Sequence, residues 1–260
     1  MIEFFQDVLN IITEHYEFLL RGVGYTMLIA MVGTVAGLVI GLATGVMRTC
    51  PLSKRLPLRC AQRGLNGLIA AYVEIFRGTP MMVQAMVIYW GYAFATGGST
   101  LPLVPSGILI VSINTGAYMA EIVRGGIISV DKGQFEGAAA VGMTHWQTMR
   151  HVVLPQVLRN ILPSVANEFV INIKDTSVLN VIGVTELYYF AGVIKRESFQ
   201  TFQTYLVVCV IYFILTFSVT RLLRLIERKL EGSDSFVICG SQSDPNAEIR
   251  VPKRQEVPND

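Results

Sequence analysis

Long stretches without charge alternate with short basic segments along this chain. Uncharged residues run from 22 to 47, from 78 to 120 and from 198 to 220, and a further apolar stretch at 156–173 is interrupted by Pro163 and Glu168. A helix needs about 20 apolar residues to cross a bilayer. The stretch 78–120 is long enough for two helices, with Gly97, Gly98 and two prolines marking the turn. The pattern therefore predicts an all-α protein with about five transmembrane helices.

The basic residues predict the orientation. Lys and Arg gather in three segments, at 48–63, 124–159 and 221–229, whereas residues 1–17 carry four acids and no Lys or Arg. Positively charged loops are retained in the cytoplasm. We therefore expect an extracytoplasmic segment at 1–17, a membrane domain over 18–230, and a cytoplasmic C-terminus.

Two segments are expected to contact the membrane without a simple crossing. If residues 176–194 crossed the membrane, the basic segment 221–229 would lie outside. We therefore expect residues 176–194 to re-enter or to lie on the outer side, buried against protein. Residues 56–77 mix Arg and Glu with apolar residues before an Arg-Gly-Thr-Pro break. They are expected to form a helix at the inner interface or, alternatively, an N-terminal extension of the second span.

The composition supports a membrane protein. Hydrophobic residues make up 52% of the chain and charged residues only 15%, against about 25% charged in soluble domains. This excludes an ordinary soluble enzyme, a disordered protein and a nucleic-acid binder. Residues 231–260, in contrast, are polar and mixed in charge, and are expected to form a disordered cytoplasmic tail. The cysteines at 50, 60, 209 and 239 have no metal-ligand or disulfide spacing, so we expect free thiols and no metal site.

Glycine recurs at every fourth position of the first span, at 33, 37, 41 and 45. Small residues at this spacing form a groove that lets another helix backbone approach closely. We expect a helix to pack there, from this chain or from another subunit.

The sequence offers candidate docking residues but no catalytic ones. It contains no GxxxxGK[ST] phosphate loop, no HExxH and no GxSxG. The predicted cytoplasmic loop at about 129–157 contains small residues between Glu136 and Gly142. We expect a short helix from Glu136 to Arg150, ended or bent at Gly142, with Leu154-Pro155 stopping the chain before the next span. Such a helix suits docking in a groove of another protein, or it simply links two spans.

This loop resembles the EAA loop of bacterial ABC importer permeases. Glu136, Ala138, Gly142, Leu154 and Pro155 match the pattern, whereas Gly137 replaces an alanine and Val152 an isoleucine. Three further segments are similar to those of the polar amino-acid uptake branch, which includes histidine, glutamine and arginine permeases: Glu74–Pro80 with Gln84, Ala117–Gly126, and Lys174–Ser177 with Ile182, Glu186 and Leu187. The resemblance extends from about residue 16 to 231.

The resemblance implies a MetI-like permease fold in the bacterial cytoplasmic (inner) membrane, crossing it several times. It implies a second permease subunit, identical or related, a cytoplasmic ABC ATPase dimer, and an extracytoplasmic amino-acid-binding protein. ATP and magnesium would be bound by the ATPase, with no cofactor in this chain. The residues expected to couple to the ATPase are Glu136, Gly137, Ala138, Ala139, Gly142, Arg150, Leu154 and Pro155.

A substrate site is expected where charged groups enter the membrane. Asn114, Tyr118 and Glu121 share one helix face, and an intramembrane acid is a functional candidate. Glu121 could bind the ammonium of an amino acid, and Arg124, Asn172 or Lys174 could donate hydrogen bonds to the carboxylate of that amino acid. Asp175 is a further candidate substrate-binding residue. Alternatively, Glu121 with Arg124 and Lys174 with Asp175 form structural ion pairs.

The resulting hypothesis is the translocating permease of an ATP-driven importer of a polar amino acid, with glutamine favoured among the neutral and acidic ones. The alternative is an ion-coupled secondary transporter that works alone. Such transporters are built from internal repeats with paired broken helices, and this chain shows no convincing repeat. A membrane-embedded enzyme would need a cluster of His, Cys or Asp within the spans, which the sequence lacks.

Overall fold

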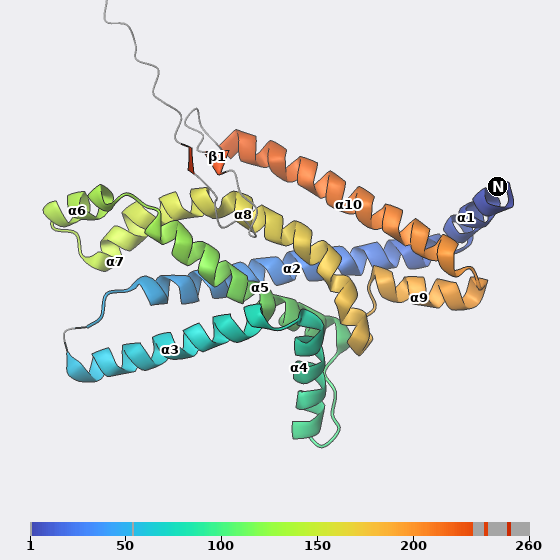
Figure 1. Ribbon diagram of the computed structural model, residues 1–260, viewed down its shortest axis with the longest axis horizontal. Coiled ribbons are helices and arrows are strands. Elements are labelled where there is room, and N and C mark those ends of the chain that lie inside the picture. Colours follow the sequence, from blue (N-terminus) through green and yellow to red (C-terminus); the bar gives the residue numbers. More distant parts are fainter. Residues whose placement is uncertain (1, 54, 231–236, 239–248, 251–260) are drawn as a thin grey trace, which may run out of the picture.

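The protein is a bundle of helices in a computed structural model that describes residues 2–53, 55–230, 237–238 and 249–250 (Figure 1). The helices in chain order are α1 (Ile2–Glu14), α2 (Tyr16–Thr49), α3 (Leu56–Gly78), α4 (Met81–Ala95), α5 (Leu103–Ile128), α6 (Lys132–Ala140), α7 (His145–Thr148), the π-helix η1 (Met149–Val153), α8 (Leu154–Asp175), the 3-10 helix η2 (Thr176–Ile182), α9 (Leu187–Ser198) and α10 (Thr201–Leu230). Two short strands, β1 (Val237–Ile238) and β2 (Ile249–Arg250), pair antiparallel.

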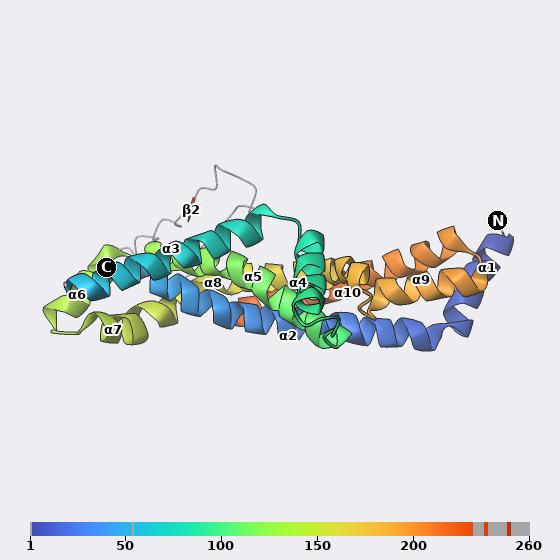
Figure 2. The ribbon, with the colours of Figure 1, turned by 90° about the horizontal axis from the view of Figure 1, so that it is seen from below.

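The bundle is elongated, and α2 runs along most of its length (Figures 1 and 2). Helices α6 and α7 lie at one end, and α1 lies at the opposite end. Helices α3 and α5 occupy the half nearer α6, and α9 occupies the half nearer α1. Helix α4 stands crosswise to the long helices in both views.

The long apolar helices agree with the predicted spans in part. Within the described residues, α2, α5 and residues 201–227 of α10 are long and apolar enough to cross a membrane. A fourth crossing results if the bent pair of His145–Ile182 and Leu187–Ser198, at 57°, is one span. The predicted span that begins near residue 78 falls on α4, which has 15 residues, or about 22 Å of helix. By length and composition, the described residues thus provide three or four membrane crossings.

The glycine stripe of α2 packs against α5 of the same chain. A Cβ atom at Gly33 would lie 2.5 Å from a side-chain carbon of Val111, and one at Gly45 would lie 2.8 Å from Val123. Gly37 and Gly41 face the intervening turns of α5 in the same way. The expected groove is therefore present, and the helix that fills it comes from this chain.

A polar cluster joins three helices inside the bundle. The amide nitrogen of Asn172 on α8 donates hydrogen bonds to the hydroxyl oxygens of Thr34 on α2, at 2.8 Å, and Thr115 on α5, at 3.0 Å. The Thr115 hydroxyl donates in turn to the Asn172 carbonyl oxygen at 3.2 Å. All three residues are buried. Buried polar groups that satisfy each other fix the relative register of the helices that carry them.

The break between α3 and α4 is closed by Gln84. Its amide nitrogen donates to the backbone carbonyls of Phe76 and Thr79, each at 2.9 Å, and its carbonyl oxygen accepts from Asn114 at 2.8 Å. The last carbonyls of a helix have no intrahelical donor. Gln84 thus caps the end of α3 and ties the break to α5. Helix α3 ends at Gly78, as expected, and runs lengthwise beside α5 rather than across the bundle (Figure 1).

The segment predicted to re-enter is buried against protein. Within it, Leu179, Val184, Leu187, Ala191 and Ile194 are fully buried. The chain bends between η2 and α9, where Gly183 has a φ of 86°. The Glu186 carboxylate caps α9 by accepting the backbone N–H groups of Tyr188 and Tyr189, at 2.9 and 2.7 Å.

The described cysteines agree with the predicted free thiols, whereas the described part of the predicted disordered tail forms two paired strands. Cys50, Cys60 and Cys209 are free, whereas Cys239 lies outside the described residues. Of the predicted tail, 231–260, the description covers β1 and β2, and the predicted disorder of the rest falls outside it.

Candidate functional site

The predicted docking helix exists, but it begins before Glu136, the residue at which it was expected to begin. It is α6, which begins at Lys132, where the Asp131 side chain caps it by accepting the backbone N–H of Gly133 at 2.6 Å. Asp at this position satisfies a backbone donor that the first helical turn leaves unpaired. Figure 1 shows α6 at the end of the molecule, far from α1.

Gly142 ends α6, which is one of the two predicted outcomes, and a second helix, α7, follows it. Gly142 has a φ of 80°, which glycine adopts without strain. Its N–H donates to the Ala139 carbonyl, and the Met143 N–H donates to the Ala138 carbonyl, each at 3.0 Å. These two bonds are the Schellman arrangement that ends a helix. A capping box between Thr144 and Gln147 then starts α7.

Leu154 and Pro155 do not stop the chain, contrary to the prediction. Helix α7 passes through η1 directly into α8, and Leu154 donates its N–H to the carbonyl of Met149, five residues back. Proline has no N–H and removes one α-helical hydrogen bond. The wider π turn before Pro155 lets the chain continue into α8 without a break.

The α6 residues differ in exposure. Glu136, Gly137, Ala139 and Gly142 are exposed, whereas Ala138 is buried against the rest of the chain. Arg150 and Pro155 are exposed on the following helices, and Leu154 packs on the cluster that contains Val153 and Val157. The arrangement presents a small-residue helix, anchored on one side, at the end of the bundle.

A second candidate site is a cavity of about 250 Å³ beside the α3–α4 break. It unites four of the seven predicted substrate residues, although they come from different helices. Its lining is Thr79, Pro80, Met81, Asn114, Tyr118, Glu168, Ile171, Asn172 and Asp175. The lining combines carboxylates, amides and a phenol with apolar groups, a mixture typical of small-molecule sites.

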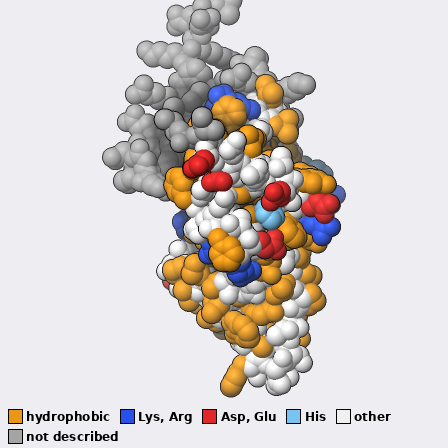
Figure 3. All heavy atoms as spheres, turned by 90° about the vertical axis from the view of Figure 1, so that its right-hand side faces the viewer, with side chains coloured by type: hydrophobic (Ala, Val, Ile, Leu, Met, Phe, Trp, Pro, Cys, Tyr) orange, Lys and Arg blue, Asp and Glu red, His pale blue; other side chains and the backbone are white. Residues whose placement is uncertain are grey.

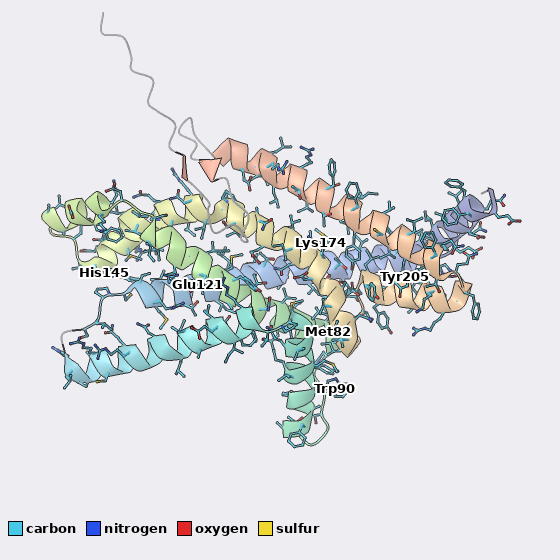
Figure 4. All side chains as sticks on the ribbon, in the orientation of Figure 1. Met82, Trp90, Glu121, His145, Lys174 and Tyr205 are labelled. Carbon is cyan, nitrogen blue, oxygen red and sulfur yellow. The ribbon has the colours of Figure 1, made fainter. Side chains whose placement is uncertain are left out.

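Glu121 and Arg124 lie outside this cavity and form a structural ion cluster, which was the alternative interpretation. The Glu121 carboxylate accepts hydrogen bonds from Arg124, at 2.8 and 3.1 Å, and from Arg48 at the end of α2. Figure 4 shows Glu121 on α5, displaced from α4 toward the α6 end of the bundle. The assignment of Glu121 to an ammonium site is therefore not supported, because two guanidinium groups already occupy its carboxylate.

Lys174 is also absent from the cavity lining. It is exposed on α8, whereas its neighbours Asn172 and Asp175 line the cavity. Successive helix positions point about 100° apart, so adjacent residues face different surroundings. The amide nitrogens of Asn114 and Asn172 are committed to Gln84 and to two threonines, respectively.

Glu168 is the cavity residue that was missing from the predicted site. Its side chain is 4% exposed and lies on α8, one helical turn before Asn172. An acid within an apolar stretch is a functional candidate by default. That signal was visible in the sequence, where Glu168 interrupts the apolar run at 156–173.

Arg77 contacts the cavity indirectly. Its guanidinium lies 5.6 Å from the centre of the Tyr118 ring, a cation–π geometry. It thereby connects the last turn of α3 to a cavity-lining residue of α5.

Proteins related in sequence are membrane components of transport systems. The profile of the family described as "Binding-protein-dependent transport system inner membrane component" matches residues 61–232. The chain belongs to this family. It is therefore a multi-pass membrane component of a transport system rather than an enzyme. A glutamine transport system permease protein, GlnP of Escherichia coli (strain K12), is 36% identical over 218 residues, which are 82% of this chain and 93% of GlnP. The L-cystine transport system permease protein TcyB of Bacillus subtilis (strain 168) is 36% identical over 211 residues, which are 81% of this chain and 85% of TcyB.

Solved structures show the same fold. An amino acid ABC transporter crystallised with histidines has a TM-score of 0.72 and 33% identity, covering 84% of this chain and 96% of that one. The MetNI methionine ABC transporter has a TM-score of 0.70 at 21% identity and covers 84% of this chain and 99% of that one. The predicted MetI-like permease fold is confirmed.

Proposed function

We propose that this chain is the translocating permease of an ATP-binding-cassette importer for a polar amino acid. The observation that carries the proposal is helix α6, a capped, exposed, small-residue helix at the end of the bundle in a member of the binding-protein-dependent family. Such a helix gives a separate ATPase a surface to push. The glutamine permease relative makes glutamine the favoured cargo.

The coupling element comprises α6 and the turn that follows it. Glu136, Gly137, Ala139 and Gly142 contact the ATPase, while Ala138 holds α6 to the bundle. Arg150, Leu154 and Pro155 connect the element to α8 without a break. Closure of the ATPase pair on ATP moves α6, and the continuous α7–η1–α8 path passes that movement to the cavity.

The cavity beside the α3–α4 break holds the substrate. Its carboxylates, Glu168 and Asp175, suit the ammonium of an amino acid, and the Tyr118 hydroxyl suits a polar group. Asn114 and Asn172 shape the wall through their bonds to other helices. Lys174, Glu121 and Arg124 act outside the cavity.

The assembly comprises a second permease subunit, a cytoplasmic ATPase dimer and an extracytoplasmic binding protein. The Lys and Arg residues of segments 48–63, 124–159 and 221–229 support a cytoplasmic location for α6 and an extracytoplasmic one for α1. The binding protein therefore delivers its cargo at the α1 end.

Uptake by proteoliposomes that contain the permease with its copurified ATPase, supplied with the binding protein, tests the proposal. We expect ATP-dependent uptake of labelled glutamine, with competition by the amino acids that the cavity accepts. Asp175→Asn should lower uptake at limiting substrate roughly tenfold, the effect of losing one charged hydrogen bond. Lys174→Gln, on the adjacent exposed position, should leave uptake unchanged. Uptake without ATP, or equal effects of the two substitutions, would contradict the proposal.

A further inference from the structure

Helix α1 has two apolar faces, and the protein covers only one of them. Ile11 is 2% exposed and belongs to the same apolar cluster as Leu187, Ala191, Ile194 and Val207 of α9 and α10, with Val8 packed against it. The Phe4 ring contacts the Phe202 ring on α10, with 6.0 Å between their centres. This face docks α1 on the bundle.

The second apolar face is uncovered. Phe5, Leu9 and Ile12 are 62%, 59% and 41% exposed. Their spacing of four and three residues places them in one stripe along the helix. Gln6 and Asn10, each one position further along, are also exposed but belong to the polar face.

Contacts with α10 locate α1 relative to the bilayer. Helix α10 is uncharged from Thr201 through Thr220, which is about 30 Å of helix and matches the hydrocarbon thickness. Arg221 and Arg224 follow at one end, so the other bilayer boundary lies near Thr201. Helix α1 meets α10 at this boundary, through Phe202 and through a 3.3 Å hydrogen bond from Gln203 to Asp7.

From this position we infer that α1 lies in the bilayer surface, with Phe5, Leu9 and Ile12 inserted among the acyl chains of phospholipids. The helix has 13 residues, too few to span, and has an apolar stripe beside a polar face, as interfacial helices do. With α1 on the extracytoplasmic side, the orientation given under the proposed function, the contacted lipids belong to the outer leaflet of the cytoplasmic membrane. The inference is independent of transport and of the cavity.

The charges of α1 specify the lipid class. Its polar face carries Glu3, Asp7 and Glu14, and the helix has no Lys or Arg. Figure 3, which looks onto this end of the molecule, shows acidic side chains among exposed hydrophobic ones. Anionic headgroups would be repelled, so the helix suits zwitterionic phospholipids and is held by its apolar stripe alone.

Site-specific fluorescence quenching tests this placement. The chain has two tryptophans, so Trp90→Phe with Trp146→Phe gives a background without tryptophan. Single variants Phe5→Trp and Leu9→Trp report on the stripe, and Gln6→Trp and Asn10→Trp are matched controls on the same helix. Each full-length variant is placed in nanodiscs of phosphatidylcholine with brominated acyl chains, with and without added phosphatidylglycerol.

We expect the lipid bromines to quench positions 5 and 9 at least about twofold more than positions 6 and 10, and acrylamide in the water to show the reverse order. Added phosphatidylglycerol should not increase the quenching. Three results would overturn the inference: equal bromine quenching at all four positions, stronger acrylamide quenching at 5 and 9, or protection that appears only when two permease copies share a disc. The last result would assign the stripe to a second copy of the chain.

Discussion

A Cβ atom at Gly37 of α2 would lie 2.8 Å from the Cβ of Thr115 on α5. Carbon atoms in van der Waals contact are about 3.5–4.0 Å apart, so the two helices are as close as a glycine allows. Thr115 also contributes to the hydrogen-bonded cluster with Asn172 and Thr34. Close packing of α2 and α5 and the polar cluster are therefore one structural unit.

Gly37→Ala should destabilise the protein, because the added methyl group pushes α2 away from α5. Overpacking of this kind costs about 1–3 kcal/mol. Thermal unfolding of the detergent-solubilised permease measures the effect. Gly24→Ala is the control on the same helix, because a Cβ there meets nothing within 4 Å. Equal melting temperatures for the two variants would contradict the close packing.

Gln84→Glu should weaken the joint between α3 and α4. The substitution keeps the shape but replaces the amide donor that binds the Phe76 and Thr79 carbonyls. Unsatisfied buried acceptors cost about 1–3 kcal/mol. We expect a lower melting temperature and faster proteolysis near residue 79. The surface substitution Gln6→Glu should change neither, and a stable Gln84→Glu variant would show that the cap is dispensable.

Two glycines of the coupling element should respond differently to alanine. Gly142 requires a left-handed backbone, with φ 80°, where a side chain costs roughly 1–2 kcal/mol. Gly137 is helical, and a Cβ there meets nothing within 4 Å. Gly142→Ala should thus reduce ATPase binding, whereas Gly137→Ala should preserve or improve it. Binding assays with the purified subunits measure both, and the opposite order would refute this role for the turn.

Glu121→Gln should lower stability rather than substrate affinity. The carboxylate joins Arg48 of α2 to Arg124 of α5, and the substitution leaves two guanidinium groups facing each other. We expect a loss of about 1–3 kcal/mol, seen in thermal unfolding, with an unchanged KM for uptake. Glu17→Gln breaks an exposed ion pair with Arg21, keeps an oxygen that can accept from the Tyr16 hydroxyl, and should be neutral. A raised KM at normal stability would return Glu121 to the substrate site.

The membrane class, the glycine groove and the buried segment at 176–194 could be predicted because each depends on a local pattern. Helix periodicity placed Asn114, Tyr118 and Glu121 on one face, but it carried no information about what lies opposite each turn. The structure shows Gln84 opposite Asn114 and Arg48 opposite Glu121, residues 30 and 73 positions away. Such long-range contacts separate a cavity wall from an ion cluster on a single helix face.

After α6, the residue types predicted one helix end correctly and another wrongly. Gly142 was expected to end or bend a helix, and it does end α6. Pro155 was expected to stop the chain, yet η1 absorbs its missing hydrogen bond and the helix continues. Whether a proline breaks a helix depends on whether the preceding turn can widen into a π turn, which the residue types alone do not reveal.

Copurification of the ATPase measures the central claim most directly. Detergent-solubilised wild type would be compared with a Glu136→Lys, Gly142→Asp double variant, with Glu17→Gln as a folded control at the other end of the molecule. The proposed function predicts that the ATPase copurifies with wild type and the control and is lost from the double variant, while all three proteins remain folded. An ATPase retained equally by the double variant, or absent from folded wild type, would contradict it.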